Sequence, residues 1–183
     1  NVSDEPIVFK NNEAFSRLGT IADFFLMHDR EIHKRCDDSV VKTLKGTTAF
    51  LRRARGFAPF PIKLNKEEKH ILACGADLKN TFCLTKGEYA FISQHIGDME
   101  NFETMSSFEQ GIELFKKLFQ ITPELVVHDL HPDYLSTRYA MSLDIPKIGI
   151  QHHFAHALSC MAEHGSVGPG LAIVMDGTGY GED

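Results

Sequence analysis

The chain has 183 residues, of which 43% are hydrophobic and 24% charged, and its formal net charge at pH 7 is −6. This length and composition support a folded core in one ordinary domain or in two small or partial ones. The negative charge argues against a protein that mainly binds nucleic acid, and no apolar run approaches the ~20 residues that cross a membrane. Four scattered cysteines without a C-x-x-C pair, and no visible signal peptide, favour reduced thiols in a cytoplasmic protein.

The first part of the chain, residues 1–62, contains short helix and strand signals. We expect a helix over residues 11–18 and strands over 22–28, 39–44 and 48–51, the last two flanking a turn at 45–46. Asn11 or Asn12 is the expected helix cap, and Gly19 is expected to end the helix. The charged run 63–69 follows two prolines and is expected to be a linker to a second domain over residues 70–183.

The second part has a more regular pattern of strands and helices. We expect strands over 71–74, 81–84, 89–95, 125–127, 147–151 and 171–176, and helices near 106–119, 134–143 and 152–164. Ser106 or Ser107 is the expected cap of the first of these helices. The order βββαβαβαβ predicts an α/β fold in which an antiparallel edge leads into a parallel sheet. Ligands on such sheets collect at the carboxyl ends of strands, where Asp77, His128 and Asp176 are expected.

Two histidines lie one helical turn apart at the start of the last predicted helix. His152 and His156 then share one face, and neutral imidazoles at this spacing can hold a divalent metal. Asp176, at the expected end of a strand, can complete the ligand set, whereas Asp129 and His131 are weaker candidates. A chance pair that only caps the helix is the alternative, because the chain has ten histidines. Histidine and carboxylate ligands suit both zinc and iron.

Glycine-rich and basic segments offer candidate phosphate contacts. Gly177, Thr178 and Gly179 leave backbone N–H groups free to approach a phosphate. The loop 75–81 is either a tight hairpin or a phosphate site, and its sequence alone decides for neither. The arginines and Ser39 of the first part suit phosphate or carboxylate recognition, with a solvated charged surface as the alternative. His153 points to another side of its helix, where it meets substrate or is structural.

Together these motifs resemble the HypF family of carbamoyltransferases, which help to mature nickel–iron hydrogenases. The resemblance runs over nearly the whole chain. Its motifs are Asn1 to Ile7, His28 to Arg30, Arg35 to Val41, Arg52 to Phe57, Cys74 to Phe82, Ser93 to Asp98, His128 to Pro132, Gln151 to His156 and Asp176 to Gly181. It implies the end of a YrdC-like domain over residues 1–62. It also implies the first lobe of a Kae1-like domain, of the actin, Hsp70 and sugar-kinase type with a ribonuclease-H-like core, over 70–183.

The resemblance implies a two-stage reaction that uses carbamoyl phosphate and ATP. Carbamate is joined to ATP as carbamoyl-adenylate, and the carbamoyl group then passes to the C-terminal cysteine of an acceptor protein, HypE. The implied cofactors are ATP and a divalent metal, zinc or iron, held by His152, His156 and Asp176. The candidate catalytic residues are Lys79, Asp77 and His153. The candidate cofactor-binding residues are Ser3, Arg30, Arg35, Ser39, Arg53, Arg55, Gly75, Asn80, Gly177, Thr178 and Gly179.

The sequence departs from the family pattern at one histidine. Phe154 stands where the family has the third histidine of Q-H-H-H-A-H, but the i, i+4 pair is kept. The family's other domains and the second lobe have no counterpart in these residues, so we expect a fragment that is inactive alone. The competing interpretations are a tRNA threonylcarbamoyl transferase, which shares both domain types, and a non-catalytic module that docks a partner. A metalloprotease is disfavoured because no glutamate follows the first histidine.

Overall fold

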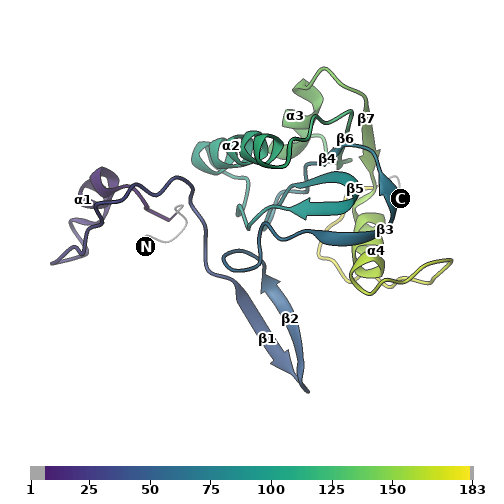
Figure 1. The fold of residues 1–183 in the computed structure, drawn as a ribbon, viewed down its shortest axis with the longest axis horizontal. Helices are drawn as coiled ribbons and strands as arrows, with labels where there is room; N and C mark the ends of the chain where they lie inside the picture. The colour runs from purple at the N-terminus through teal and green to yellow at the C-terminus, as the bar shows by residue number, and fades with distance from the viewer. Residues whose placement is uncertain (1–6, 182–183) are drawn as a thin grey trace.

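The computed structural model describes residues 7–181, and Figure 1 shows a sheet flanked by helices, with a small N-terminal part lying away from it. In chain order the elements are α1 (Asn11–Leu18), β1 (Val40–Leu44), β2 (Thr47–Arg52), β3 (Ile62–Glu68), β4 (Ile71–Ala73), β5 (Cys83–Ile92), α2 (Phe102–Phe119), β6 (Leu125–Asp129), α3 (Leu135–Ser142), β7 (Lys147–Ile150) and α4 (His152–Glu163). Within the described part, no helix combines the length and apolar character needed to cross a membrane.

The main sheet has five strands in the order β3-β5-β4-β6-β7. β5 pairs antiparallel with both β3 and β4, whereas β4, β6 and β7 run parallel. The expected antiparallel edge followed by a parallel sheet is therefore confirmed. Parallel strands need a crossover between them, and α2 and α3 supply the two crossovers.

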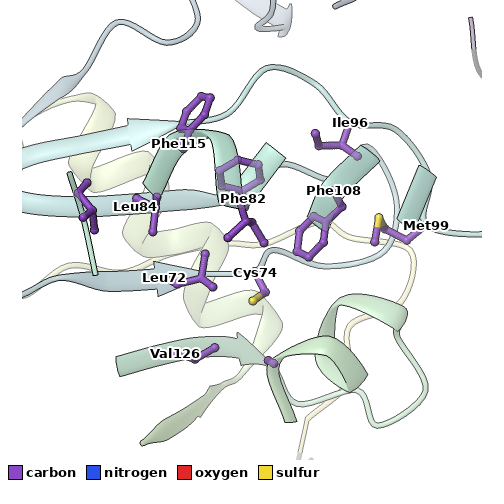
Figure 2. Close-up of a cluster of buried hydrophobic side chains, with 12 residues drawn as sticks. Leu72, Cys74, Phe82, Leu84, Ile96, Met99, Phe108, Phe115 and Val126 are labelled. Atoms are coloured by element: carbon purple, nitrogen blue, oxygen red, sulfur yellow. The ribbon is translucent and has the colours of Figure 1, made fainter. Parts of the chain in front are cut away.

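The core lies between one face of this sheet and helix α2 (Figure 2). Leu72 of β4 and Val126 of β6 are fully buried there, because alternate residues of neighbouring strands point to the same face. The ring of Phe82 lies edge-on to Phe108 and Phe115 of α2, with centroids 5.9 and 5.0 Å away. A truncation such as Phe82→Ala in so dense a cluster typically costs about 3–5 kcal/mol. This packing fixes the sheet, and the carboxyl ends of its parallel strands carry the site described below.

Helix α4 lies on the opposite face of the sheet. Ala73 and Val127 alternate with the core residues of their strands, and they line a pocket together with Ala155 and Ser159 of α4. None of the α4 residues is fully buried, so this helix is attached mainly through the strand that precedes it. Its position therefore depends on β7.

The N-terminal part contains the predicted helix and hairpin. β1 and β2 pair antiparallel around Lys45 and Gly46, whose φ angles of 50° and 81° are those of a tight type I′ turn. The expected N-cap of α1 is wrong, because the N-cap is Lys10 and both asparagines lie inside the first turn, whereas Gly19 ends the helix as expected. Asn11 instead donates from Nδ2 to the carbonyl of His28, at 2.6 Å, and so ties the helix to the following segment.

Two strand predictions fail because the segments have no strand to pair with among the described residues. The expected strand over 22–28 is irregular, and Phe24 is 93% exposed. The expected strand over 171–176 is also unpaired, and Leu171 and Met175 are 94% and 92% exposed. An apolar run indicates a strand only where a neighbouring edge is free to accept it. Asp176 therefore follows an extended, unpaired segment rather than a sheet strand.

The linker expected over 63–69 is also wrong, since most of it forms the edge strand β3. Its lysines and glutamates face solvent, which is the usual composition of an exposed sheet edge. The strands expected over 81–84 and 89–95 are one continuous strand, β5, which bends at Gly87 with a φ of 56°. The cap of α2 is Asn101, whose Oδ1 accepts from the Thr104 N–H at 2.8 Å, rather than Ser106 or Ser107.

Candidate functional site

The site begins where two parallel strands end side by side. Asp129, the last residue of β6, is in register with Ile150, the last residue of β7. The chain then turns directly into α4, with Gln151 as its N-cap and His152 as its first residue. The Gln151 Oε1 accepts from the Phe154 N–H at 2.8 Å, which fixes the helix start. The sheet register therefore sets His152 beside Asp129.

His152, His156 and Asp176 converge on one point. The Asp176 Oδ2 lies 2.8 Å from His152 Nε2 and 3.5 Å from His156 Nε2, and the two imidazole nitrogens are 3.2 Å apart. The spacing of the histidines follows from one turn of α4, and the aspartate arrives from the segment after that helix. The residue types and their spacing predicted these three side chains as one set, and the structure brings them together.

This donor set fits a divalent metal. Four ligands placed tetrahedrally at 2.0–2.2 Å from one ion stand about 3.3–3.6 Å apart. The ligand atoms of the three side chains all lie within 4.8 Å of one another. Only small side-chain movements separate this arrangement from a coordinating one. Two imidazoles and a carboxylate suit zinc or iron and leave further positions for a substrate oxygen.

The Asp176 carboxylate is held in its ionised form. The Gly177 N–H donates to Oδ1 at 2.8 Å, and this bond, followed by the nearby imidazoles, keeps the pKa of Asp176 below its usual range. A carboxylate that accepts a backbone N–H with one oxygen presents the other in a fixed direction. Oδ2 is that other oxygen, and it faces the histidines.

Asp129 contacts the other side of His152. Its Oδ2 lies 2.6 Å from His152 Nδ1, and its Oδ1 accepts from the His131 N–H at 2.8 Å. The residue is only 8% exposed, and its carbonyl also accepts from the Thr137 hydroxyl. Sequence reasoning ranked Asp129 as a weak candidate, since its role depends on the pairing register of β6 and β7. The detectable signal was a carboxylate at a strand end preceding the histidine helix.

A pocket of about 360 Å³ opens beside these residues. It is bounded by the loop after β4 and by the ends of β6, β7 and α4, including Gly75, Asp129, His152 and His156. A small acyl or phosphate group fits a volume of this size. The pocket places the loop 75–81 and the histidine pair around one space, as expected for strand carboxyl ends.

The glycine-rich segment 177–179 runs along His153. A Cβ built on Gly179 would lie only 2.2 Å from His153 Nε2, so the backbone touches the imidazole ring. His153 Nδ1 is 3.3 Å from the Gln151 amide. Tyr180 then lies edge-on to His131 with centroids 5.2 Å apart. His153 therefore packs against the glycine segment and is not among the three convergent side chains.

The loop 75–81 is a tightly bonded turn. Gly75 has a φ of 67°, and a Cβ there would lie 2.3 Å from the Thr81 carbonyl. Asn80 is 2% exposed and donates from Nδ2 to the carbonyls of Cys74 and Ala76, which holds the turn closed. Its amide hydrogens are thus already used, and the expected role of Asn80 as a phosphate donor is not supported. The exposed Lys79 has a φ of 51°, and its N–H donates to Asp98.

Asp77 lies in an acidic environment near the site. Burial, followed by the neighbouring Asp98, raises its pKa, and His131 opposes this shift. Burial raises the pKa of the Tyr134 hydroxyl, and the negative charges of Asp129, Asp77 and Asp176 raise it further. Asp77 therefore faces the same region as Asp129 and Asp176, although it contacts neither.

The basic candidates of the first part mostly bind the protein's own backbone. Arg35 donates to the carbonyl of Ile96 at 2.9 Å, and Arg53 donates to the carbonyls of Phe57 and Phe60. Arg55 pairs with Asp38 at 3.3 Å. The Ser39 hydroxyl bridges the same segment, since it donates to the carbonyl of Arg55. Arg35 and Arg53 reach the end of β5 and the residues after it, whereas the other contacts stay within the N-terminal part, so these groups do not converge with the histidine pair.

Two further candidates need separate mention. Arg30 is exposed in the segment after α1, which Figure 1 shows at the opposite end of the molecule from α4. Ser3 lies outside the described residues. The structure thus places the candidates in two groups, one around α4 and one around the N-terminal part.

Comparison with known proteins identifies both parts of the chain. A family model described as "HypF Kae1-like domain" matches residues 66–163, and one described as "Telomere recombination", for Sua5, YciO and YrdC proteins, matches residues 1–54. Over its whole length the chain is 47% identical to carbamoyltransferase HypF2 of Cupriavidus necator. It is 46% identical to carbamoyltransferase HypF of Synechocystis. It spans 24% of the length of each of these two relatives.

Solved structures agree with these matches. The chain superposes with a TM-score of 0.94 on a full-length HypF described as phosphate- and nucleotide-bound, with 54% identity over 100% of this chain and 29% of that one. HypF of T. kodakarensis matches with a TM-score of 0.83 and 38% identity, over 91% of this chain and 22% of that one. The α/β fold is that of a YrdC-like portion followed by a Kae1-like portion. The chain therefore belongs to the HypF family of carbamoyltransferases.

Proposed function

We propose that this chain is part of an enzyme that uses carbamoyl phosphate and ATP to form carbamoyl-adenylate. The enzyme then transfers the carbamoyl group to the C-terminal cysteine of a HypE-type acceptor during nickel–iron hydrogenase maturation. The observation that carries the proposal is the convergence of His152, His156 and Asp176 beside a glycine-rich segment. The family membership supports the carbamoyl chemistry. The chain spans about a quarter of its relatives, so the activity belongs to the longer protein.

The proposed metal site consists of His152, His156 and Asp176 and takes zinc or iron. A divalent ion there would supply positive charge for phosphate and acyl oxygens of a bound adenylate. The chain's own residues orient that adenylate. Gly177, Thr178 and Gly179 directly follow the Asp176 ligand, so a phosphate on their backbone N–H groups would lie next to the metal. The Gly177 N–H is already turned toward Asp176 Oδ1, which leaves the later two for the ligand.

The proposed nucleotide is ATP, and the related nucleotide-bound HypF structure supports this choice. Gly75 is part of the proposed phosphate site because its missing side chain allows close approach at the pocket mouth. Lys79 is exposed at the same loop and able to reach an anion. In the N-terminal part, Arg30, Arg35, Ser39, Arg53, Arg55 and Ser3 remain proposed nucleotide contacts. Three of these arginines would have to exchange backbone carbonyls for phosphate oxygens.

Carbamoyl phosphate is first hydrolysed to carbamate and phosphate elsewhere in the longer protein, and the proposed transfer then has two balanced steps. A carbamate oxygen attacks the α-phosphorus of ATP, and pyrophosphate leaves. The acceptor's thiolate sulfur then attacks the carbamoyl carbon, a C–S bond forms, and the C–O bond breaks as AMP leaves. Asp77, which faces the site with a raised pKa, is the proposed proton acceptor for the incoming thiol. His153 is the proposed support of the phosphate-binding segment.

The competing functions are less well supported. A tRNA threonylcarbamoyl transferase would also need a metal and ATP, but the matched relatives are named carbamoyltransferases over the entire chain. A docking module has no need of three convergent ligand atoms. The free cysteines agree with the proposed cytoplasmic location, since none of the described cysteines forms a disulfide.

The test uses the longer carbamoyltransferase that contains this chain. It is incubated with carbamoyl phosphate, ATP and the purified acceptor, and the mass of the acceptor is then measured. We expect wild type to carbamoylate the acceptor's C-terminal cysteine and a His152→Ala/His156→Ala variant to lose this activity. His164→Ala is the control, because it changes an exposed histidine at the end of α4, and it should keep the activity. The 183-residue chain alone is expected to give no transfer, because a partial site does not exclude water. Carbamoylation by the chain alone, or full activity of the double variant, would contradict the proposal.

A further inference from the structure

Asp129 has a place in the site that the three convergent ligands do not explain. Its carboxylate is almost fully buried at the end of β6, where an unpaired charge is costly. Both oxygens are used, since Oδ1 accepts from the His131 N–H at 2.8 Å and Oδ2 lies 2.6 Å from His152 Nδ1. The backbone of β6 and a neighbouring loop N–H thus fix the direction in which the carboxylate faces the imidazole.

The two ring nitrogens of His152 have different partners. Nδ1 faces Asp129, whereas Nε2 faces Asp176 Oδ2 at 2.8 Å and His156 Nε2 at 3.2 Å. A neutral imidazole carries one N–H, and only its other nitrogen can bind a metal. A carboxylate accepts hydrogen bonds and donates none, so Asp129 requires the N–H at Nδ1. The lone pair is then on Nε2, which points to the shared ligand position.

We propose that Asp129 is a positioning residue that holds His152 in the Nδ1–H tautomer and so directs its Nε2 to the metal. The inference rests on the proposed metal site and deepens it. Metal-bound histidines commonly donate their second N–H to a carboxylate, which raises ligand basicity and fixes the ring. Here the carboxylate comes from β6 and the histidine from α4, so the parallel pairing of β6 and β7 sets ligand orientation.

The chemistry of Asp129→Asn makes it a sharp test. An asparagine has one acceptor oxygen, but this position accepts two hydrogen bonds. If the oxygen keeps the His131 N–H, the NH₂ group faces His152 Nδ1 and favours the tautomer with its proton on Nε2. If the amide is turned the other way, the His131 N–H loses its partner. In either orientation the near-isosteric variant loses one of the two hydrogen bonds that fix this side chain and the His152 ring, so we expect weaker metal binding without a cavity.

The experiment uses the longer carbamoyltransferase that contains this chain and measures its Zn²⁺ affinity by competition with a chromophoric chelator. Wild type is compared with Asp129→Asn, Asp129→Ala and Asp144→Asn. Asp144 is the matched control because it is an exposed carboxylate just before β7, at the opposite end of the sheet. We expect both Asp129 variants to bind about 10–100-fold more weakly and the control to be unchanged. Long-range ¹H–¹⁵N spectra of the zinc-loaded wild type should show His152 with Nδ1–H and a metal-shifted Nε2.

The outcomes separate the two proposals. If wild type binds zinc but both folded Asp129 variants match it within about twofold, the positioning role is wrong and the metal site stands. A zinc-loaded wild type in which His152 binds through Nδ1 also overturns it. If wild type binds no more tightly than His152→Ala/His156→Ala, the metal site itself is wrong. Should Asp129→Ala fail to fold, Asp129→Asn still decides the question, with circular dichroism as the check on folding.

Discussion

The backbone of Gly179 lies directly against the imidazole of His153. A Cβ at position 179 would be 2.2 Å from His153 Nε2 and 2.7 Å from two ring carbons, far below any normal contact. The segment that carries Asp176 thus rests on a side chain of the same helix that carries both histidines of the proposed metal site. In this way Asp176, whose segment pairs with no strand among the described residues, is aligned with the two histidines.

This contact predicts the effect of Gly179→Ala. The added methyl group must displace either the ring or the segment, so Asp176 moves and zinc affinity falls by roughly tenfold, at the low end for changes around metal ligands. Removing the ring in His153→Ala/Gly179→Ala should restore affinity to within about threefold of His153→Ala, because neighbouring changes are not additive. Chelator competition measures all three. Equal losses with and without the ring would show that the contact is unimportant.

A second prediction concerns Lys34 and pH. Burial, followed by the adjacent Arg35, lowers the pKa of Lys34 from 10.5 to about 8, and its ammonium donates to the carbonyl of Ser107. Between these two pKa values the unfolded chain binds more protons than the folded one, so the free energy of unfolding rises with pH. Lys34→Met should flatten this rise between pH ~8 and ~10.5.

Urea unfolding at several pH values measures the Lys34 effect. Lys117→Met is the matched control, since Lys117 is exposed on α2. The control should keep the wild-type slope. A Lys34→Met variant whose stability rises with pH as steeply as wild type would contradict the prediction.

The cysteines should differ sharply in reactivity. Burial raises the pKa of both Cys74 and Cys83 to about 12, so almost no thiolate is present near neutral pH. Cys160 is exposed on α4, whereas Cys36 is partly covered and its pKa is raised by burial. Iodoacetamide should label Cys160 first and Cys36 more slowly, with Cys74 and Cys83 unlabelled until the chain is denatured. Peptide mass spectrometry gives the order, and labelling of native Cys74 at the Cys160 rate would refute it.

Helix capping provides a stability test. The Asn101 side chain accepts from the Thr104 N–H, so Asn101→Ala should lower the free energy of unfolding by about 0.5–2 kcal/mol. Asn101→Asp keeps an acceptor and should cost much less. Ser106→Ala is the informative control, because Ser106 lies inside α2 and its hydroxyl contacts only the exposed Gln110 amide among the described bonds. Chemical denaturation measures these differences, and a larger loss for Ser106→Ala would restore the serine as the effective cap.

Elements whose position depends on local hydrophobic or histidine spacing could be predicted from the sequence alone. The phenylalanines of α2 and the histidines of α4 are placed by helical spacing, and both helices formed, although α2 begins at Phe102, before the expected serine caps. The convergence of Asp176 with His152 also followed from residue types in chain order, although the strand expected to deliver the aspartate is absent among the described elements.

The incorrect strand predictions concern segments whose structure depends on whether a neighbouring strand pairs with them. The charged run of β3 is a strand because β5 offers it an edge, and the apolar run before Asp176 is not a strand because none of the described strands pairs with it. Asp129 shows the same dependence for function. Its proximity to His152 comes from the register of β6 on β7, which no single segment encodes.

The parallel pairing of β4 with β6 has a consequence for synthesis. Ile71 pairs with Leu125, a separation of 54 residues (125 − 71), while β4 pairs with β5 only about ten residues later. At typical translation rates of about 5–20 residues per second, β4 therefore waits roughly 3–11 s for its second neighbour. During that interval one edge of an apolar strand is open to other chains. Since the histidine pair follows β7, zinc or iron could be captured only after this vulnerable stage has passed.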